Sequence, residues 1–333
     1  MGINEKEMYI CSPEDSSDAW NELIKTVPED FDGYIFYKIR RDSIGKSGGD
    51  PTWGDVYKCN KNKISYCGKC VYKKLDYDYP KSAYAEKLWS LIGKRVLKDC
   101  RVPDITLIRD SKYKELGMLS HIILDNDTED LIDMNTLMFY KYERQDLNKF
   151  KLIVNFEDLL ECIKVQVSDE KNYGEIERQV VETLLLDCVT NNTDRHTNNW
   201  CLVRDKNTNK YVLGVFDHSS SFVDMMTEGL KGVSKNGWTS TSIRTTEQSA
   251  KLGIGDNGDV LLKYLVKKYP EISKSFLDTL TINLPDFYED IKEMSGDIDT
   301  KRIRRNLESK VEQIRGLILP DERNERGGRE IDE

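Results

Sequence analysis

The sequence predicts a two-lobed α+β protein with a β-rich N-terminal lobe and a mostly helical C-terminal lobe. Short strand-like runs concentrate before residue 125, and apolar residues recur at helical spacing over most of the chain after residue 134. A single hairpin pattern interrupts those helices at 200–217. We divide the chain into an N-terminal extension (1–29), an N-lobe (30–125), a C-lobe (126–319) and a charged tail that we expect to be disordered (320–333).

The first predicted strand, Tyr34 to Ile39, leads into a glycine-rich segment that contains Gly45, Gly48 and Gly49. A glycine-rich loop between strands can wrap its backbone N–H groups around phosphates. The spacing does not match Gly-x-Gly-x-x-Gly, so a flexible linker is an equally good interpretation.

Two further strands, at 63–66 and 70–75, are expected to form a hairpin that turns at 68–69. The second of them ends in Lys73 and Lys74. A helix at 82–98 follows, with Glu86 in its first turns. A strand lysine that is oriented by a glutamate on the next helix can hold nucleotide phosphates. We prefer Lys74, because an apolar residue follows it and ends the strand; two ordinary surface charges are the alternative.

Strands are also predicted at 102–108 and 117–123. The second of these, around Leu119 and His121, would lead into the link between the lobes, whose backbone could pair with an adenine. The acidic segment 125–133 is predicted to be a loop.

The most informative residues are Asp194, Asn199 and Asp217. A strand-like run follows Asn199, a second one precedes Asp217, and the polar turn between them centres near Thr208. Directly opposed residues on paired strands have Cα atoms about 4.5–5.5 Å apart. The sequence therefore predicts that Asn199 and Asp217 face each other across the open end of a hairpin and present two oxygen ligands to one cation.

These three groups suit phosphoryl transfer, with Asp194 as the acceptor of a hydroxyl proton and the other two as magnesium ligands. Asp and Asn also cluster in ordinary turns, but the second strand that ends in Asp favours the functional interpretation. A transition-metal hydrolase is a further alternative, because Asp194, His196, Asp217 and His218 are all possible ligands.

Past this hairpin, residues 223–258 are rich in Ser and Thr and could accept phosphate, although a flexible surface loop explains them equally well. Helices are predicted at 259–268, 271–280, 286–294 and 301–317.

The composition narrows the function classes. The chain has 333 residues and a formal net charge of −9, which argues against nucleic-acid binding as the default. It contains no apolar run near the roughly 18–20 residues that span a bilayer, and Met1 to Ile10 lack a signal-peptide pattern. The 8 cysteines are too sparse for a disulfide scaffold. We expect a cytoplasmic protein with no stable membrane association; the sequence does not reveal whether it is exported.

The stretch Asn192-Thr-Asp-Arg-His-Thr-Asn-Asn-Trp, followed by Val215-Phe-Asp, resembles the HipA-like serine/threonine protein kinases, especially the compact cell-translocating kinase A type. Its Asp-Arg-His-x-x-Asn run is also similar to the catalytic loop of phosphoinositide kinases. Both likenesses imply a two-lobed protein-kinase-like fold with ATP and Mg²⁺ as cofactors. Only the resemblance to the HipA-like kinases implies a protein substrate with a Ser/Thr acceptor.

Carried over to this sequence, the resemblance implies Asp194 as the base, Asn199 and Asp217 as magnesium ligands, and Lys74 as the phosphate lysine. His196 would brace the loop or touch the transferred phosphate, while Arg195 has no evident role. Because only residues 1–29 precede the predicted N-lobe, we expect no counterpart of the extra N-terminal domain of the toxin kinases, and an antitoxin partner is left open. A lipid or small-molecule kinase and a nucleotide-binding pseudokinase scaffold are the alternative functions.

Overall fold

The structure is a computed structural model that describes residues 34–38, 52–60, 63–74, 82–109, 116–124, 127–139, 154–192, 194–226, 243–244 and 257–318. The chain divides into two compact units. Unit 1 contains Met1–Ser90 and Pro103–Ile123, and unit 2 contains Leu91–Val102 and Leu124–Glu333. The predicted phosphate loop with Gly45, Gly48 and Gly49, the extension 1–29 and the tail 320–333 lie outside the described residues.

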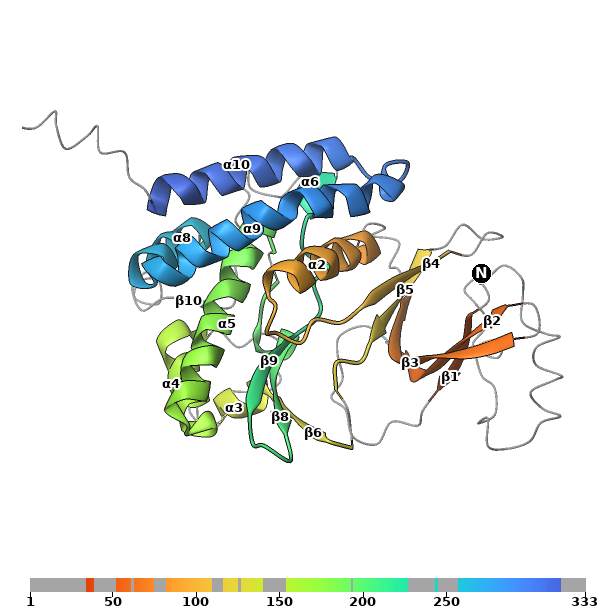
Figure 1. Ribbon diagram of the computed structural model, residues 1–333, viewed down its shortest axis with the longest axis horizontal. Helices are drawn as coiled ribbons and strands as arrows, with labels where there is room; N and C mark the ends of the chain where they lie inside the picture. Colours follow the sequence, from red (N-terminus) through yellow and green to blue (C-terminus); the bar gives the residue numbers. More distant parts are fainter. Residues whose placement is uncertain are drawn as a thin grey trace, which may run out of the picture. The chain divides into compact units, whose positions relative to one another are not determined.

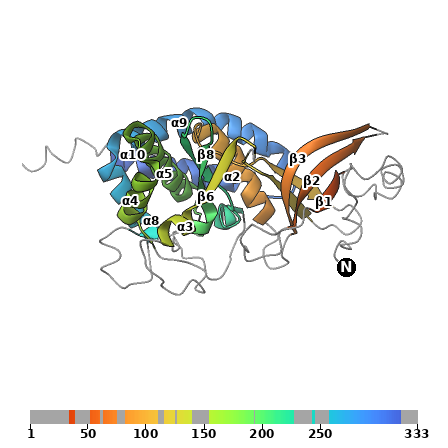
Figure 2. The same cartoon turned by 90° about the horizontal axis from the view of Figure 1, so that it is seen from below.

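Unit 1 is built on a five-stranded antiparallel sheet with the order β1-β2-β3-β5-β4. Its strands are β1 (Tyr34–Lys38), β2 (Thr52–Asn60), β3 (Lys63–Lys74), β4 (Ile105–Arg109) and β5 (Leu116–His121), and Figure 2 shows the first three side by side. Helix α2 (Ser82–Val96) begins in this unit, where its Ala83 packs against Ile105 and Met118 of the sheet. Lys87 fixes the same contact by donating from Nζ to the Ile105 carbonyl at 2.7 Å.

The predicted hairpin at 68–69 is wrong, because β3 runs without interruption from Lys63 to Lys74. The register with β2 shifts between Val56 and Tyr57, so the strand absorbs an extra residue as a bulge beside Gly68. Glycine in a strand therefore marks a bulge here rather than a turn. The predicted hairpin would place Lys73 opposite Ile64 and Lys74 opposite Lys63, which is also wrong. Lys73 pairs with Met118 and Lys74 with Gly117, both in β5.

Unit 2 is mostly helical, as predicted for the C-lobe. It contains α3 (Met134–Phe139), α4 (Phe156–Val167), α5 (Glu170–Thr190), α6 (Val223–Met226), α8 (Asn257–Lys268), α9 (Pro270–Asp290) and α10 (Thr300–Ile318), with the 3-10 turns η2 (Thr197–Asn199) and η3 (Ile291–Met294). Helix α5 is central and contacts α4, α8, α9 and α10 (Figure 1). Every residue from Gln179 to the end of this helix is buried. Asp169 begins this helix by accepting the Asn172 N–H at 2.7 Å.

A three-stranded antiparallel sheet in unit 2 has the order β6-β8-β9, formed by β6 (Glu129–Asp133), β8 (Trp200–Asp205) and β9 (Tyr211–Val215). The loop predicted at 125–133 is therefore wrong over its second half. The acidic residues of β6 are compatible with an edge strand because they pair with basic neighbours: Arg204 donates to Asp130 at 2.5 Å. Strands β7 (Val154–Asn155) and β10 (Ile243–Arg244) form a separate, parallel two-stranded sheet.

The outer edge of β9 is held by groups from outside the sheet. The Asn172 side chain accepts the Tyr211 N–H at 2.8 Å and donates to its carbonyl at 2.9 Å, which imitates a neighbouring strand. Further along, Leu213 donates to Gln179 Oε1 at 2.7 Å, and the Arg101 backbone pairs with Leu213 and Val215. The outward N–H and carbonyl groups of Tyr211 and Leu213 and the outward N–H of Val215 therefore all have hydrogen-bond partners. These contacts specify the register of the strand along its length.

Helix α9 merges the two helices predicted at 271–280 and 286–294, because it continues through Pro285. A proline inside a helix removes one backbone hydrogen bond. Leu284 and Phe287 are buried on either side of it, so packing on this helix outweighs the local cost.

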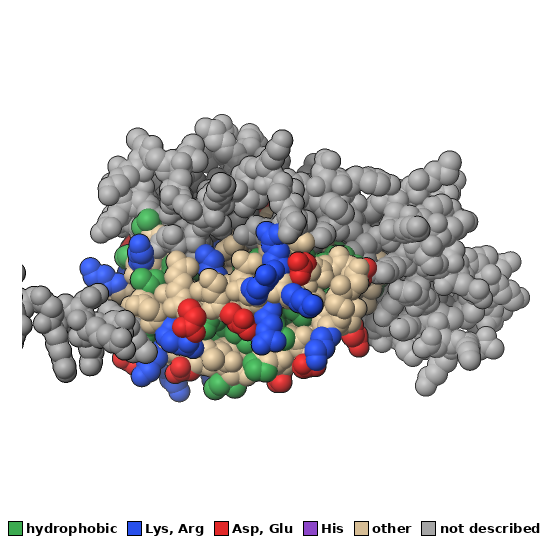
Figure 3. All heavy atoms as spheres, turned by 90° about the horizontal axis from the view of Figure 1, so that it is seen from above, with side chains coloured by type: hydrophobic (Ala, Val, Ile, Leu, Met, Phe, Trp, Pro, Cys, Tyr) green, Lys and Arg blue, Asp and Glu red, His purple; other side chains and the backbone are tan. Residues whose placement is uncertain are grey.

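Helix α10 is amphipathic, and its apolar stripe of Ile303, Leu307, Val311 and Ile314 is buried. Its outer face carries charges of both signs, which Figure 3 shows interspersed over this side of the molecule. Arg304 with Glu308 is one example, at 2.8 Å. The basic residues Lys301, Arg304 and Arg305 at the start of α10 are exposed and therefore lie on a solvated helix face. Among the described helices, none combines the length and the apolar character that crossing a membrane requires.

We predict that Asn172→Ala lowers the free energy of unfolding by about 1–3 kcal/mol, because it leaves the buried N–H and carbonyl of Tyr211 without partners. Urea denaturation measures the change. Asn306→Ala is the matched control, since the Asn306 side chain bonds only the preceding turn of α10, to Arg302 O. Its effect should stay within about 0.5 kcal/mol. Equal losses in both variants would contradict the role of Asn172 at the β9 edge.

Candidate active site

The loop that carries Asp194 starts where α5 ends. Asn191 caps the helix in the left-handed conformation (φ 52°), and the N–H groups of Asn191 and Asn192 both bond to the Asp187 carbonyl. Asparagine tolerates this conformation better than most residues. The chain therefore turns sharply out of α5 and into the candidate site.

Asp194 is held by its backbone. Its N–H donates to Asn192 Oδ1 at 3.1 Å, and its carbonyl accepts from Asn199 Nδ2 at 2.8 Å. The Asp194 side chain keeps 34% of its surface exposed. A rigid backbone with an accessible carboxylate is the arrangement that a general base requires.

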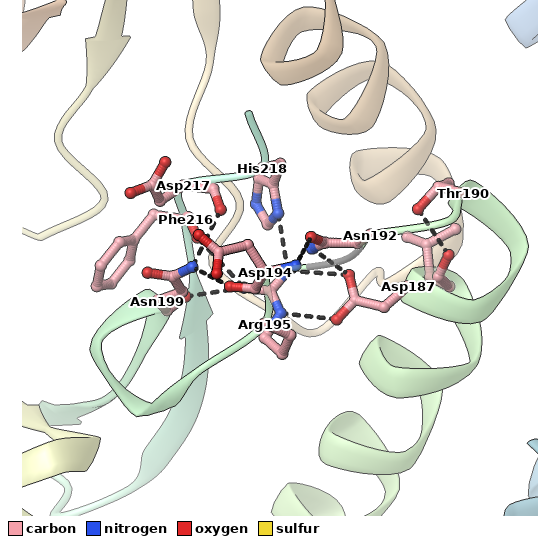
Figure 4. Close-up of polar contacts among 10 residues, drawn as sticks. Asp187, Thr190, Asn192, Asp194, Arg195, Asn199, Phe216, Asp217 and His218 are labelled. Carbon is pink, nitrogen blue, oxygen red and sulfur yellow. Dashed lines mark hydrogen bonds and ion pairs between the residues drawn. The ribbon is translucent and has the colours of Figure 1, made fainter. Parts of the chain in front are cut away.

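Asn199 links the two carboxylate residues of the site (Figure 4). It is 2% exposed, and its Nδ2 donates to the carbonyl of Asp194 and, at 3.4 Å, to that of Asp217. Because both partners are carbonyl oxygens, they require the nitrogen end of the amide. Oδ1 is thus the atom that can bind a cation.

Asp217 follows β9 in a left-handed backbone conformation with φ 57°. Positive φ is uncommon for residues other than glycine, and aspartate is among those that adopt it most readily. Ser219 Oγ donates to Asp217 Oδ1 at 3.2 Å, which helps to orient the carboxylate.

The predicted pairing of Asn199 with Asp217 is wrong by one position. Trp200 pairs with Val215, so the residue opposite Asn199 is Phe216, whose N–H donates to the Asn199 carbonyl at 3.0 Å. The turn is the four-residue segment 206–209, whose centre falls before Thr208 rather than on it. The two residues nevertheless remain in contact, through the amide of Asn199.

His196 lies beside Asp194. Its Nδ1 accepts the Asn198 N–H at 3.2 Å, and its Nε2 is 3.9 Å from Asp194 Oδ2. Because Nδ1 accepts a hydrogen bond, the proton of the neutral ring is on Nε2, the nitrogen that faces Asp194.

Arg195, for which the sequence indicated no role, is fully buried and uses all of its N–H donors. Nε and Nη2 donate to the Asp187 carboxylate at 2.6 and 3.0 Å, and Nη2 also donates to His218 Nδ1 at 2.8 Å. Nη1 donates to the carbonyls of Asn199 and Phe216 at 3.0 and 3.2 Å. A guanidinium has five N–H donors, and each has an acceptor here.

Sequence reasoning also missed Asp187, the partner of Arg195. One signal could have revealed it, since Asp187 is an acidic residue within the apolar run Leu184-Leu-Leu-Asp-Cys-Val. A buried carboxylate needs a cation or several donors.

The donor set fits magnesium, because Asn199 Oδ1 and the Asp217 carboxylate are hard oxygen ligands. It fits the transition-metal alternative poorly, since His218 Nδ1 accepts from Arg195, which places the proton of the neutral ring on Nε2 and leaves no ring lone pair for a metal. In the described part of the chain, no group of three or more His, Cys, Asp or Glu side chains could hold a metal ion. The buried thiol of Cys201 is an unsuitable nucleophile as well, because desolvation and then the nearby Asp133 raise its pKa to about 12.

The residues predicted to contact the nucleotide are in unit 1. Leu119 is buried in β5 opposite Tyr72, and His121 ends the same strand opposite Cys70. Glu86 is buried on α2, three residues after Ala83. Lys73 and Lys74 end β3.

No protein-family model matches the sequence, and a comparison with curated proteins finds no match. Solved structures do match. The Helicobacter pylori proinflammatory kinase CtkA is 16% identical, with a TM-score of 0.53 over 85% of this chain and 94% of CtkA. HipA of Shewanella oneidensis, solved with HipB and operator DNA, is 10% identical, with a TM-score of 0.49 over 89% of this chain and 69% of HipA. The likeness to CtkA shows that the chain has the α+β fold of a CtkA-type kinase.

Proposed function

We propose that the chain is an ATP-dependent kinase that transfers a phosphoryl group to Ser or Thr hydroxyls of proteins, its own included. The observation that carries the proposal is the Asn199 amide, which joins the backbone of Asp194 to that of Asp217. This contact assembles an accessible carboxylate and two oxygen ligands in one place. Phosphoryl transfer requires this set of groups, because its catalysis is mostly positioning and electrostatics.

In this proposal Asp194 orients the acceptor hydroxyl and takes its proton as the new bond to phosphorus forms. Asn199 Oδ1 and the Asp217 carboxylate would hold magnesium, whose positive charge would offset the negative charge of the phosphate oxygens of ATP. His196 would brace Asp194, since its Nε2 faces the Asp194 carboxylate at 3.9 Å.

For the phosphate lysine, the register in unit 1 favours Lys73 over the Lys74 preferred from sequence. Directly opposed residues in paired strands share a face of the sheet. Lys73 is opposite Met118, which packs against Ala83 of α2, and Glu86 is on the same helix. Position 73 is therefore on the face of the sheet that α2 covers.

We predict that Asp217→Ala abolishes transfer from ATP to a generic protein acceptor, because it removes a carboxylate ligand of magnesium. EDTA should have the same effect on the unaltered protein. Labelled ATP with mass-spectrometric mapping of phosphosites measures both. Full activity of the variant would refute the ligand scheme. Transfer to lipid vesicles but not to protein would identify a lipid kinase instead, and phosphate release without transfer a hydrolase.

Asp194→Asn should lower kcat by about 10²–10⁴-fold, the contribution of a positioned general base, and leave ATP affinity close to that of the unaltered protein. Steady-state kinetics and calorimetric titration separate the two effects. Asp278→Asn, at an exposed position on α9, is the matched control and should change neither. If the unaltered protein binds ATP but transfers nothing with any divalent cation, it is a pseudokinase.

Lys73→Ala should lower kcat/KM for ATP by about a hundredfold or more, because it removes a cation that stabilises the transferring phosphates. Lys74→Ala, one position along the same strand, is the matched control and should retain most of the activity. The reverse result would restore the lysine preferred from sequence.

A further inference from the structure

The Asp187 carboxylate joins the candidate site to the central helix of unit 2. Asp187 is 2% exposed and lies in the last turn of α5. Its Oδ2 accepts from Arg195 Nε at 2.6 Å, and its Oδ1 accepts from Arg195 Nη2 at 3.0 Å and from Asn192 Nδ2 at 2.8 Å. A buried helix end therefore provides a fixed anchor for two side chains of the loop that follows it.

Each of those side chains supports a different functional residue. Asn192 accepts the Asp194 N–H through its Oδ1 at 3.1 Å, so it carries the support to the base. Arg195 donates from Nη1 to the carbonyls of Asn199 and Phe216. It therefore holds the backbone of one proposed cation ligand, Asn199, and of the residue that precedes the other ligand, Asp217. Figure 4 shows both routes starting at Asp187.

We propose that Asp187 and Arg195 are positioning residues that set the geometry of the cation ligands Asn199 and Asp217, while Asn192 positions Asp194. The inference rests on the phosphoryl-transfer function proposed above. A buried ion pair is not needed for stability alone, since well-packed apolar residues often serve as well. What an arginine adds is a rigid, planar set of donors that fixes several acceptors at once.

Substitution by lysine tests this point, because lysine keeps the charge but has three donors on a flexible stem in place of five in a plane. Arg195→Lys cannot satisfy all the acceptors that Arg195 holds. We expect the carbonyls of Asn199 and Phe216 to lose their fixed position and the two cation ligands to lose their alignment. Asn192→Ala should instead affect only the base.

The experiment measures ATP binding by calorimetry with magnesium and with EDTA, together with the magnesium dependence of the rate. In Arg195→Lys, the gain in ATP affinity from magnesium should fall by about 10–100-fold, the usual effect of losing a partner of a metal ligand, while affinity in EDTA stays the same. Asn192→Ala should lower kcat without changing the magnesium dependence. Arg178→Lys is the matched control, because Arg178 also holds a carboxylate on α5, that of Glu182, without touching the site.

An unaltered magnesium dependence in folded Arg195→Lys would overturn the inference. If that variant does not fold, the double variant Asp187→Asn with Arg195→Gln replaces it, because it removes both buried charges and leaves neither unpaired. Loss of folding in Arg195→Lys and in the double variant would also count against the inference, because that result is expected if the ion pair only stabilises the fold. If the unaltered protein binds magnesium and ATP but transfers no phosphate, the proposed function fails while the binding comparison still tests the ion pair.

Discussion

The ion pair between Arg195 and Asp187 is the contact on which the candidate site depends. Both side chains are buried, and the guanidinium contacts the end of α5, the loop that carries Asp194 and the residue that precedes Asp217. The single side chain of Arg195 thus contacts three segments that are separated in sequence. An unpaired charge at this depth would be strongly unfavourable, so the pair favours the arrangement in which the loop is docked against the end of α5.

Strand β9 is the second constraint. Side chains of α5 hold its outer edge at Tyr211 and Leu213, and the Arg101 backbone holds it at Leu213 and Val215. Asp217, two residues beyond the end of this strand, adopts a positive φ. Its own contacts hold it there, because Asn199 Nδ2 donates to its carbonyl and Ser219 Oγ donates to its carboxylate.

Local chemistry accounts for most of the elements that were predicted correctly. The apolar stripe of α10, the run of α2 and the hairpin before Asp217 are all visible as periodic patterns. The errors fall where a local signal had two meanings. Gly68 marks a bulge rather than a turn, and Pro285 lies inside a helix rather than between two, because strand pairing and helix packing outweigh the preference of a single residue.

The sequence by itself determined the fold class, and it proposed Asp194, Asn199 and Asp217 as site residues, since residue type and spacing carry the chemistry of a site. It did not determine how those residues meet. The hairpin register depends on whether the turn has an odd or an even number of residues, which shifts Asn199 from Asp217 to Phe216. The role of Arg195 depends on Asp187, eight residues earlier on a helix. Only the tertiary structure decided both, because each depends on contacts between atoms that no local pattern places together.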